Sequence, residues 1–201
     1  MIFDHFAVSA LTLDEAVSHV EESLGVKMGA GGQHAHFATH NRLIGLEDGL
    51  YLESIAADPT VPAPSYPRWF DLDVFKGGPR ITNWICRVDD LESALEGLPK
   101  GAGDPVALTR GDLRWKMAVP ANGKLPCDGA FPALIQWQVE NLPGLSLPSA
   151  GLRLMRLEIA HPEAKWLSET VPLNDPRVVF VSGDFDMQAT FDGPNGTRVL
   201  R

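Results

Sequence analysis

Two side chains stand out because they are polar within otherwise apolar strands. His5 lies in "IFDHFAVS" and Glu53 lies in "YLESIA". An imidazole or a carboxylate is costly in such a setting unless a partner or a function satisfies it. Neutral imidazole and carboxylate groups are suitable ligands for zinc, iron or manganese, and both also act as general acids and bases. We therefore expect His5 and Glu53 to carry the chemistry, as metal ligands or as acid–base and orienting groups.

The densest histidine cluster is "QHAHFATHN", which contains His34, His36 and His40. His34 and His36 would point to one side of a strand. One of the three could complete a facial site of two histidines and one carboxylate. The alternative is that they are surface or turn residues, with Thr39 and Asn41 serving the turn. That alternative is favoured for His36 and stays open for His34 and His40.

Further side chains are candidates for binding a substrate. Arg110, in "TRGDLRWKM", could hold a carboxylate or stack on a ring. Tyr51 could line a cleft, although a tyrosine in a strand more often packs against its neighbours, and Asn41 is counted with the histidine cluster. Cys86 and Cys127 are the only cysteines, too few for a disulfide framework, which fits a reducing compartment.

The predicted strand and helix that position these residues occur twice in the sequence, 78 positions apart. "DHFAVSALTLDEAVSHV" runs from a strand through a polar break into an amphipathic helix, and "NWICRVDDLESALEGL" does the same. Each helix has an apolar stripe with the spacing i, i+3, i+4, i+7. The two stripes match residue by residue: Leu13, Ala16, Val17 and Val20 with Leu91, Ala94, Leu95 and Leu98. Such a repeat predicts paired modules that enclose a cleft.

Each copy is interpreted as one strand, one helix and three further strands, a βαβββ module. We predict the first module over residues 1–57, a proline-rich connector over 58–79 and the second module over 80–142. A third, shorter strand–helix pattern follows. It predicts that residues 150–201 form a partial third repeat or an extension that packs on the two modules. The predicted fold class is α+β, with tandem βαβββ modules forming a cleft.

Composition narrows the function classes. The chain has 17 basic and 26 acidic residues and a formal net charge of −9, which argues against nucleic acid as a partner. No apolar stretch approaches the roughly 20 residues that span a bilayer, and the N-terminus does not resemble a secretory signal. We expect a cytoplasmic protein with a small-molecule partner and no membrane or nucleic-acid partner. A homodimer is left open.

The tandem strand–helix–three-strand plan resembles the vicinal oxygen chelate superfamily, to which glyoxalase I, extradiol dioxygenases and bleomycin-resistance proteins belong. More specifically, "DHFAVSALTLDEA", "GGQHAHFATHNRLIGLEDGLYLESIAADP" and "RWKMAVP…FPALIQW" resemble bacterial glyoxalase-like domain proteins. The resemblance covers most of the chain. It implies the fold, whereas fold alone does not fix the chemistry.

The resemblance implies that each module gives one metal ligand from its first strand and one from its last. In the first module these are His5 and Glu53. In the second module the 78-residue register places Asn83 opposite His5, and strand position makes Gln136 the best counterpart of Glu53. Asn83 and Gln136 offer only neutral oxygens, so a divalent ion (zinc, iron or manganese) would need water, His34 or His40 in addition.

Two functions follow from these observations. The first is a glyoxalase-like enzyme (a lyase, isomerase or oxygenase) acting on a small oxygen-rich molecule around His5 and Glu53, with or without a metal ion. Substrate contacts are expected from the remaining polar candidates: His34, His40, Asn41, Tyr51, Asn83, Arg110 and Gln136. The second is a metal-free protein that binds and sequesters a small molecule, as bleomycin-resistance proteins do. The incomplete second-module ligand set favours the binder, and the His5/Glu53 pair favours the enzyme.

Overall fold

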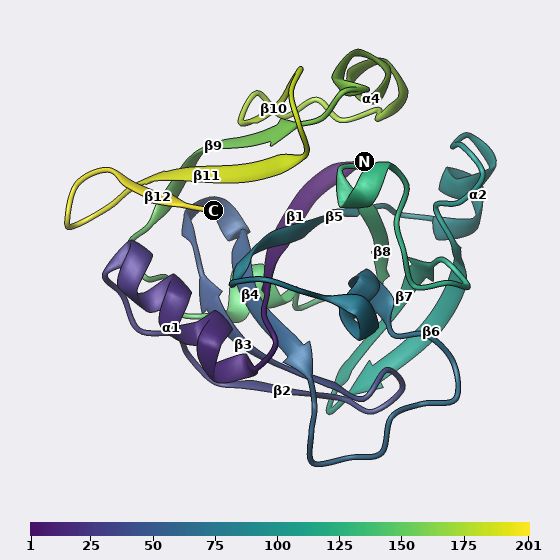
Figure 1. The fold of residues 1–201 in the computed structure, drawn as a ribbon, viewed down its shortest axis with the longest axis horizontal. Coiled ribbons are helices and arrows are strands. Elements are labelled where there is room, and N and C mark those ends of the chain that lie inside the picture. Colours follow the sequence, from purple (N-terminus) through teal and green to yellow (C-terminus); the bar gives the residue numbers. More distant parts are fainter.

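The computed structural model, which describes residues 1–201, consists of two β-sheets and four α-helices (Figure 1). The larger sheet contains β1 (Ile2–Ser9), β2 (Gly31–His34), β3 (Thr39–Gly45), β4 (Tyr51–Ala57), β5 (Arg80–Arg87), β6 (Asp104–Arg110), β7 (Leu113–Val119) and β8 (Ala133–Trp137). The smaller sheet contains β9 (Arg153–Ala160), β10 (Val178–Val181), β11 (Asp186–Asp192) and β12 (Arg198–Leu200). The helices are α1 (Leu13–Leu24), α2 (Leu91–Glu96), α3 (Pro143–Ser146) and α4 (Ala164–Thr170).

The larger sheet is made of two βαβββ modules joined through their first strands. Its strand order is β2-β3-β4-β1-β5-β8-β7-β6, and β1 pairs with β5 in antiparallel orientation. β1 and β5 are both eight residues long and begin 78 positions apart, as do α1 and α2. The N-cap residues Thr12 and Asp90 keep the same spacing. The repeat in the sequence is therefore a repeat in the structure, and the predicted fold class is confirmed.

The two modules are related by a local twofold axis between β1 and β5. Phe6 pairs with Trp84, which lies 78 positions later and is its own counterpart in the repeat. The pairs on either side mirror each other: His5 with Ile85, and Ala7 with Asn83. The antiparallel register therefore makes Asn83 the structural equivalent of His5, as the sequence predicted.

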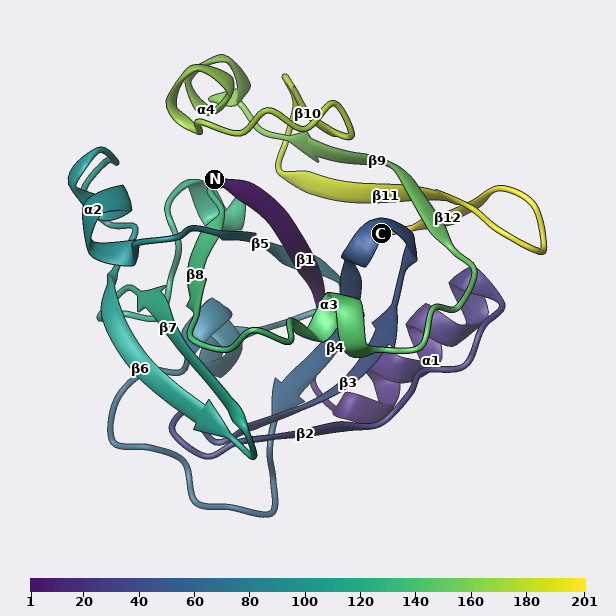
Figure 2. The same cartoon turned by 180° about the vertical axis from the view of Figure 1, so that it is seen from behind.

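The smaller sheet covers the outer face of β1 and β5 (Figures 1 and 2). It begins with a third strand and helix at the spacing of the first two, because α4 begins eleven positions after the start of β9, as α1 does after the start of β1. β10 lies parallel to β9 and β11 antiparallel to it. One core cluster joins the two sheets and includes Phe3, Phe6, Trp84, Leu157, Ile159 and Phe191.

A second, smaller core cluster lies on the concave face of the larger sheet. It includes Trp69, Trp115, Met117 and Ile135 and is separate from the cluster under the smaller sheet. None of the helices combines the length and the apolar character that crossing a bilayer requires. The concave face is where the polar candidates of the first module also meet.

Candidate functional site

A bulge in β1 brings two consecutive polar residues to the concave face. The pairing with β5 slips by one residue between Phe3 and His5, so that Asp4 is an extra residue in the strand. Phe3 and Phe6 on either side both belong to the cluster on the opposite face. A bulge of this kind re-aims side chains that strict alternation would place on opposite faces. Asp4 and His5 are consequently neighbours in one buried site.

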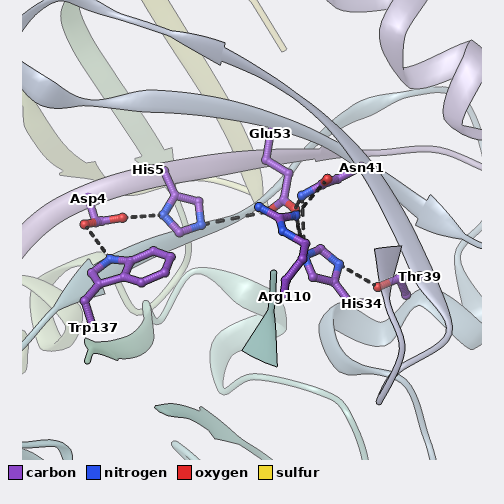
Figure 3. A network of polar contacts seen from close by, with 8 residues as sticks. All are labelled: Asp4, His5, His34, Thr39, Asn41, Glu53, Arg110 and Trp137. Carbon is purple, nitrogen blue, oxygen red and sulfur yellow. Dashed lines mark hydrogen bonds and ion pairs between the residues drawn. The ribbon is translucent and has the colours of Figure 1, made fainter. Parts of the chain in front are cut away.

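Asp4 fixes the orientation of the His5 ring. The His5 Nδ1 and Asp4 Oδ1 atoms are 2.7 Å apart, and Asp4 also accepts a hydrogen bond from Trp137 Nε1 at 3.3 Å (Figure 3). Arg87 Nη1 donates a further hydrogen bond to Asp4 at 3.3 Å. Burial opposes ionisation of Asp4, but the hydrogen bond and charge of His5 and the charge of Arg87 outweigh it, so the pKa of Asp4 is lowered. An ionised carboxylate only accepts, so His5 Nδ1 is the donor. Its Nε2 atom faces the site.

Glu53, on the neighbouring strand β4, faces His5 across a short gap. Its Oε2 atom lies 3.9 Å from His5 Nε2, beyond hydrogen-bond distance, and both side chains are almost fully buried. Its other oxygen accepts a hydrogen bond from Asn41 Nδ2. The arrangement leaves one face of each group directed at the same space.

Arg110 links the two ends of the larger sheet to this site. It is the last residue of β6, at one edge of the sheet, and its Nη1 donates to Asn41 Oδ1 (3.1 Å) and His34 Nε2 (3.2 Å) on β3 and β2 at the other edge. A Cβ at Gly32 would lie 2.9 Å from the Arg110 side chain, so a larger residue here would displace Arg110 from its present position. Figure 3 shows Arg110 between Glu53, Asn41 and His34.

His34 is held neutral. Burial, and then the charge of Arg110, lowers its pKa to about 3. Arginine can only donate, so His34 Nε2 accepts, and its Nδ1 carries the proton and donates to Thr39 Oγ1 at 3.1 Å. His34 is thus a fixed, uncharged part of the network.

Tyr51 packs against the reactive side of the site. Its ring stacks on His5 with centroids 4.1 Å apart and an interplanar angle of 15°. Burial, and then the charges of Asp4 and Glu53, raises the pKa of Tyr51 well above its ordinary value. The phenol stays protonated and therefore remains a potential hydrogen-bond donor beside His5.

A segment of the connector covers the site. Trp69–Val74 forms a short 3-10 turn, called here the covering segment, in which Phe70 and Asp71 adopt left-handed backbone angles (φ 58° and 56°). Trp69 contacts the His34 ring edge-on, and Trp69 and Phe70 line the cavity. The cavity has a volume of about 30 Å³, room for about two water molecules. Left-handed angles on two consecutive non-glycine residues store strain in this segment.

Apart from Arg110, the second module lines the same cavity with apolar groups. Ala7 and Ile85 are equivalent in the repeat, and they pair with Glu53 and Ala133 respectively, so Ala133 takes the position of Glu53. The same register through the neighbouring strands gives three more equivalent pairs: Asn41 with Met117, Thr39 with Trp115, and His34 with Leu108. The polar cluster therefore has an apolar counterpart across the site.

Three sequence candidates lie outside this cavity. Gln136 points to the opposite face of β8, where its amide bonds Asp89 O (2.8 Å) and Leu91 N (3.3 Å) at the start of α2. It was predicted in the cleft, but strand alternation directs its neighbours Ile135 and Trp137 there instead. His40 alternates away from Asn41 in the same manner.

Asn83 lies in a different cavity from His5. That cavity also contacts Phe70, so Phe70 forms part of the wall between the two. The expectation that Asn83 approaches His5 and Glu53 directly is therefore wrong for this conformation. The physical reason is the covering segment, whose position the sequence does not specify.

The donor set does not fit the metal site that the resemblance implies. Position 133 is alanine, and Asn83 lies beyond Phe70. The remaining set would be His5, His34 and Glu53, but His34 Nε2 already accepts from the Arg110 cation. No group of three or more His, Cys, Asp or Glu side chains has the arrangement of a metal site. A positive charge is already supplied here by Arg110.

Two functional features escaped the sequence reasoning. Asp4 was not among the sequence candidates, although its position inside an apolar strand was a usable signal. The covering segment was predicted only as part of the proline-rich connector over residues 58–79.

Comparison with known proteins places the chain in a family. The glyoxalase-like domain model matches residues 3–172, and the chain belongs to this family. A hypothetical protein from Staphylococcus aureus is similar in structure, with a TM-score of 0.61 and 15% identity over 92% of this chain and 87% of that one. None of the curated proteins compared with the chain matches it.

More distant structural similarity extends over about two thirds of the chain. Methylmalonyl-CoA epimerase from Mycobacterium tuberculosis has a TM-score of 0.43 and 19% identity, covering 67% of this chain and 85% of that one. A hypothetical protein from Bacillus halodurans has a TM-score of 0.43 and 14% identity, covering 69% and 97%. At these identities the similarity concerns the fold alone.

Proposed function

We propose that this member of the glyoxalase-like domain family is an enzyme that moves a proton on a small, anionic, oxygen-rich substrate, with His5 and Glu53 as the acid–base pair. The observation that carries the proposal is the alignment of Asp4, His5 and Glu53. A carboxylate fixes the imidazole through Nδ1, and a second carboxylate faces Nε2 across 3.9 Å. A carboxylate that orients an imidazole through its Nδ1–H is a recurrent way to prepare a general base.

The proton step follows from this geometry. His5 Nε2 removes a proton from a carbon next to a carbonyl group, and the electron pair of the broken C–H bond moves onto the carbonyl oxygen to give an enolate. The His5 imidazolium then gives the proton to a different atom of the enolate, or passes it to Glu53, which delivers it there, and the isomerisation is complete with the neutral imidazole restored. No oxidant, reductant or second substrate is consumed, because the proton lost is the proton, or an equivalent one, regained.

Arg110 supplies the charge that the enolate needs. The structure records hydrogen bonds from its Nη1 atom alone, so the other donors of the guanidinium remain for a carboxylate or an enolate oxygen. The protonated Tyr51 beside His5 is a second donor for a developing oxyanion. The substrate class is therefore an enolisable carboxylate or phosphate ester rather than a neutral molecule.

A substrate enters only when the covering segment moves, because a cavity of about 30 Å³ is smaller than any such molecule. The strain at Phe70 and Asp71 lowers the cost of that movement. Trp69, which contacts His34, should report the movement as a change in fluorescence.

The test is solvent-deuterium exchange. Small enolisable carboxylates and phosphate esters are incubated with the protein in D₂O, and loss of the C–H signal is followed by NMR. We expect catalysed exchange for at least one compound, and a roughly 10²–10⁴-fold loss in His5→Gln and in Glu53→Gln. His36→Gln, which alters an exposed histidine of the same sequence cluster, is the matched control and should keep the activity.

Sequestration without turnover is the competing function. The observation that favours it is the apolar second half of the cavity, with Met117, Trp115 and Trp137. A binder would show saturable quenching of Trp69 with no deuterium incorporation from any compound of the panel. That result, obtained with folded protein, would replace the enzyme proposal.

A further inference from the structure

A buried polar residue without a partner marks the second cavity of the concave face. Asn83 is 3% exposed, and its Oδ1 atom makes no hydrogen bond. Leaving a buried acceptor unpaired costs about 1–3 kcal/mol, and such groups are rare in folded proteins. Asn83 therefore lowers stability where an apolar residue would not, which calls for a role other than packing.

The cavity in front of Asn83 is larger than the one at His5. It measures about 190 Å³ and lies between the covering segment, β5 and the turn Cys127–Gly129. The turn backbone must come close, since a Cβ at Gly129 would lie 2.7 Å from Thr82 O and 3.6 Å from Asn83 Nδ2. The backbone of this turn therefore forms one wall of the cavity beside Asn83.

The charges at the rim are predominantly positive. Lys76, Arg80 and Lys124 line the cavity together with Asp71 and Asp128. Lys124 is paired with Asp128 at 2.8 Å, whereas neither Lys76 nor Arg80 forms an ion pair. Arg80 Nη1 donates to the carbonyl oxygens of Lys76 and Gly78, and its guanidinium lies 4.3 Å from the Phe75 ring, which leaves its other N–H groups as donors. In a chain of net charge −9, the two positive charges of Lys76 and Arg80 against the single carboxylate of Asp71 favour an anionic guest.

The second cavity is also connected to the first by the fold. Asn83 is the repeat equivalent of His5, and Phe70 lines both cavities. The movement of the covering segment that admits a substrate to His5 would remove the wall between them. One elongated molecule could then reach from His5 to Asn83.

We propose that the Asn83 cavity is a second binding subsite, which holds an anionic group at the far end of the substrate through Lys76, Arg80 and the Asn83 amide. The identification of the guest as part of the substrate rests on the proposed function. The anionic group is a phosphate or a carboxylate, with a neighbouring hydroxyl available to donate to Asn83 Oδ1. Phosphate and carboxylate share the charge that the rim selects.

The subsite is tested with inorganic phosphate and with acetate as separate probes of the wild-type protein. Each is titrated into ¹⁵N-labelled protein, and the side-chain amide of Asn83, assigned by its absence in Asn83→Ala, is followed by NMR. We expect saturable shifts with a dissociation constant of about 1–10 mM for the better probe. Stronger binding of phosphate would indicate a phosphorylated substrate, and stronger binding of acetate a dicarboxylate.

Variants decide whether the binding is local. Arg80→Gln and Lys76→Gln should each weaken it roughly tenfold, whereas Lys165→Gln, on the exposed side of α4, should not change it. Asn83→Ala should abolish the shifts elsewhere at the cavity while its unfolding midpoint stays equal to or above that of the wild type. Absence of saturable shifts with both probes, or equal weakening by Lys165→Gln, would overturn the proposal.

The outcome is independent of the reaction at His5. Phosphate and acetate are not turned over, so the subsite can fail while deuterium exchange persists, in which case the proposed function stands without it. If the subsite binds and no compound exchanges, the proposed function fails instead. A destabilised Asn83→Ala with unchanged phosphate binding would assign Asn83 a packing role and would also overturn the proposal.

Discussion

The first module presents His34, Asn41 and Glu53 to the cavity. At the equivalent positions the second module carries Leu108, Met117 and Ala133. The backbones follow the same register, so the difference lies in the side chains alone. The repeated backbone therefore determines the direction of each side chain, whereas the type of side chain at equivalent positions differs between the modules. Here polarity is concentrated in one half, and the other half buries apolar surface.

This division has an energetic reason. A buried polar network is stable only when all its members are satisfied, and a partly satisfied one is worse than an apolar core. Asn41 connects Glu53 and Gly32 of the first module with Arg110 of the second module by hydrogen bonds. Two such networks facing each other would double the desolvation cost without adding a function. An apolar second half supplies hydrophobic stabilisation and keeps water from the first.

The largest effect should come from the residue that orients His5. Asp4→Asn keeps the shape of the site but can place an N–H donor against Nδ1, so that His5 takes the wrong tautomer. We expect the exchange rate to fall roughly 10²–10⁴-fold, mainly in kcat rather than KM. A rise in KM beside the fall in kcat, together with a lowered unfolding midpoint, would instead indicate a structural role for Asp4.

Exchanging residues between the two halves should cost several kcal/mol. Met117→Asn places an unpaired amide in the apolar cluster and should lower the free energy of unfolding by about 2–4 kcal/mol. Asn41→Met leaves Glu53 without its hydrogen-bond donor and removes one of the two acceptors of Arg110 Nη1, and should cost about as much. Met155→Asn, at an exposed methionine, should change it by less than about 0.5 kcal/mol. Urea unfolding measures all three, and a neutral Met117→Asn would contradict the division.

The pH dependence of stability should differ between the halves. The folded pKa of His34 is about 3 against 6.5 in the unfolded chain, so below pH 6.5 the unfolded state binds a proton that the folded state does not. Stability from this residue is therefore lost as pH falls from 6.5 toward 3, at about 1.4 kcal/mol per pH unit. Asp4, whose pKa is lowered from 3.8, stabilises the folded state above that pH, and this contribution is lost only as the pH falls below 3.8. His34→Leu, which introduces the residue of the second half, should reduce the slope between pH 4 and 6 accordingly.

An unchanged slope in His34→Leu would show that His34 is protonated in the folded state. Its bond from Arg110 Nη1 would then be impossible, because both groups would be donors. Denaturant titrations at several pH values, compared between wild type and variant, provide the measurement.

The smallest effects should be equal in the two modules. Thr12 and Asp90 cap α1 and α2 at equivalent positions, and each side chain accepts a backbone N–H three residues on. Thr12→Ala and Asp90→Ala should each lower the free energy of unfolding by about 1 kcal/mol. A large difference between them would mean that the two helices contribute unequally to the common fold.

Much of the architecture could be predicted because it depends on periodic features. The apolar stripes of α1 and α2 and the distance of 78 residues between them specify two equivalent modules. The same offset predicts that Asn83 is equivalent to His5. These features follow from helix and strand periods, which the sequence displays directly.

The site could be predicted only in part, because its details depend on exceptions to those periods. The bulge at Asp4 breaks strand alternation and leaves no mark in the sequence that separates it from an ordinary strand. Gln136 was misplaced because the last strands of the two modules are offset by 80 positions, which makes Ala133 the counterpart of Glu53 and leaves Gln136 on the opposite face of β8. The position of Phe70 depends on tertiary packing of the connector.

The most direct measurement of the central claim is the tautomeric state of His5 and His34, read from the ¹⁵N shifts of their imidazole rings at about pH 8.5, where an ordinary histidine is neutral. We predict that both rings carry the proton on Nδ1, His5 because of Asp4 and His34 because of Arg110. His5 Nε2 is then free to accept a proton opposite Glu53. In Asp4→Asn the His5 ring should lose this preference while His34 keeps it. A His5 ring protonated on Nε2 in the wild-type protein would place a donor toward Glu53 and would contradict the proposal that His5 is the base.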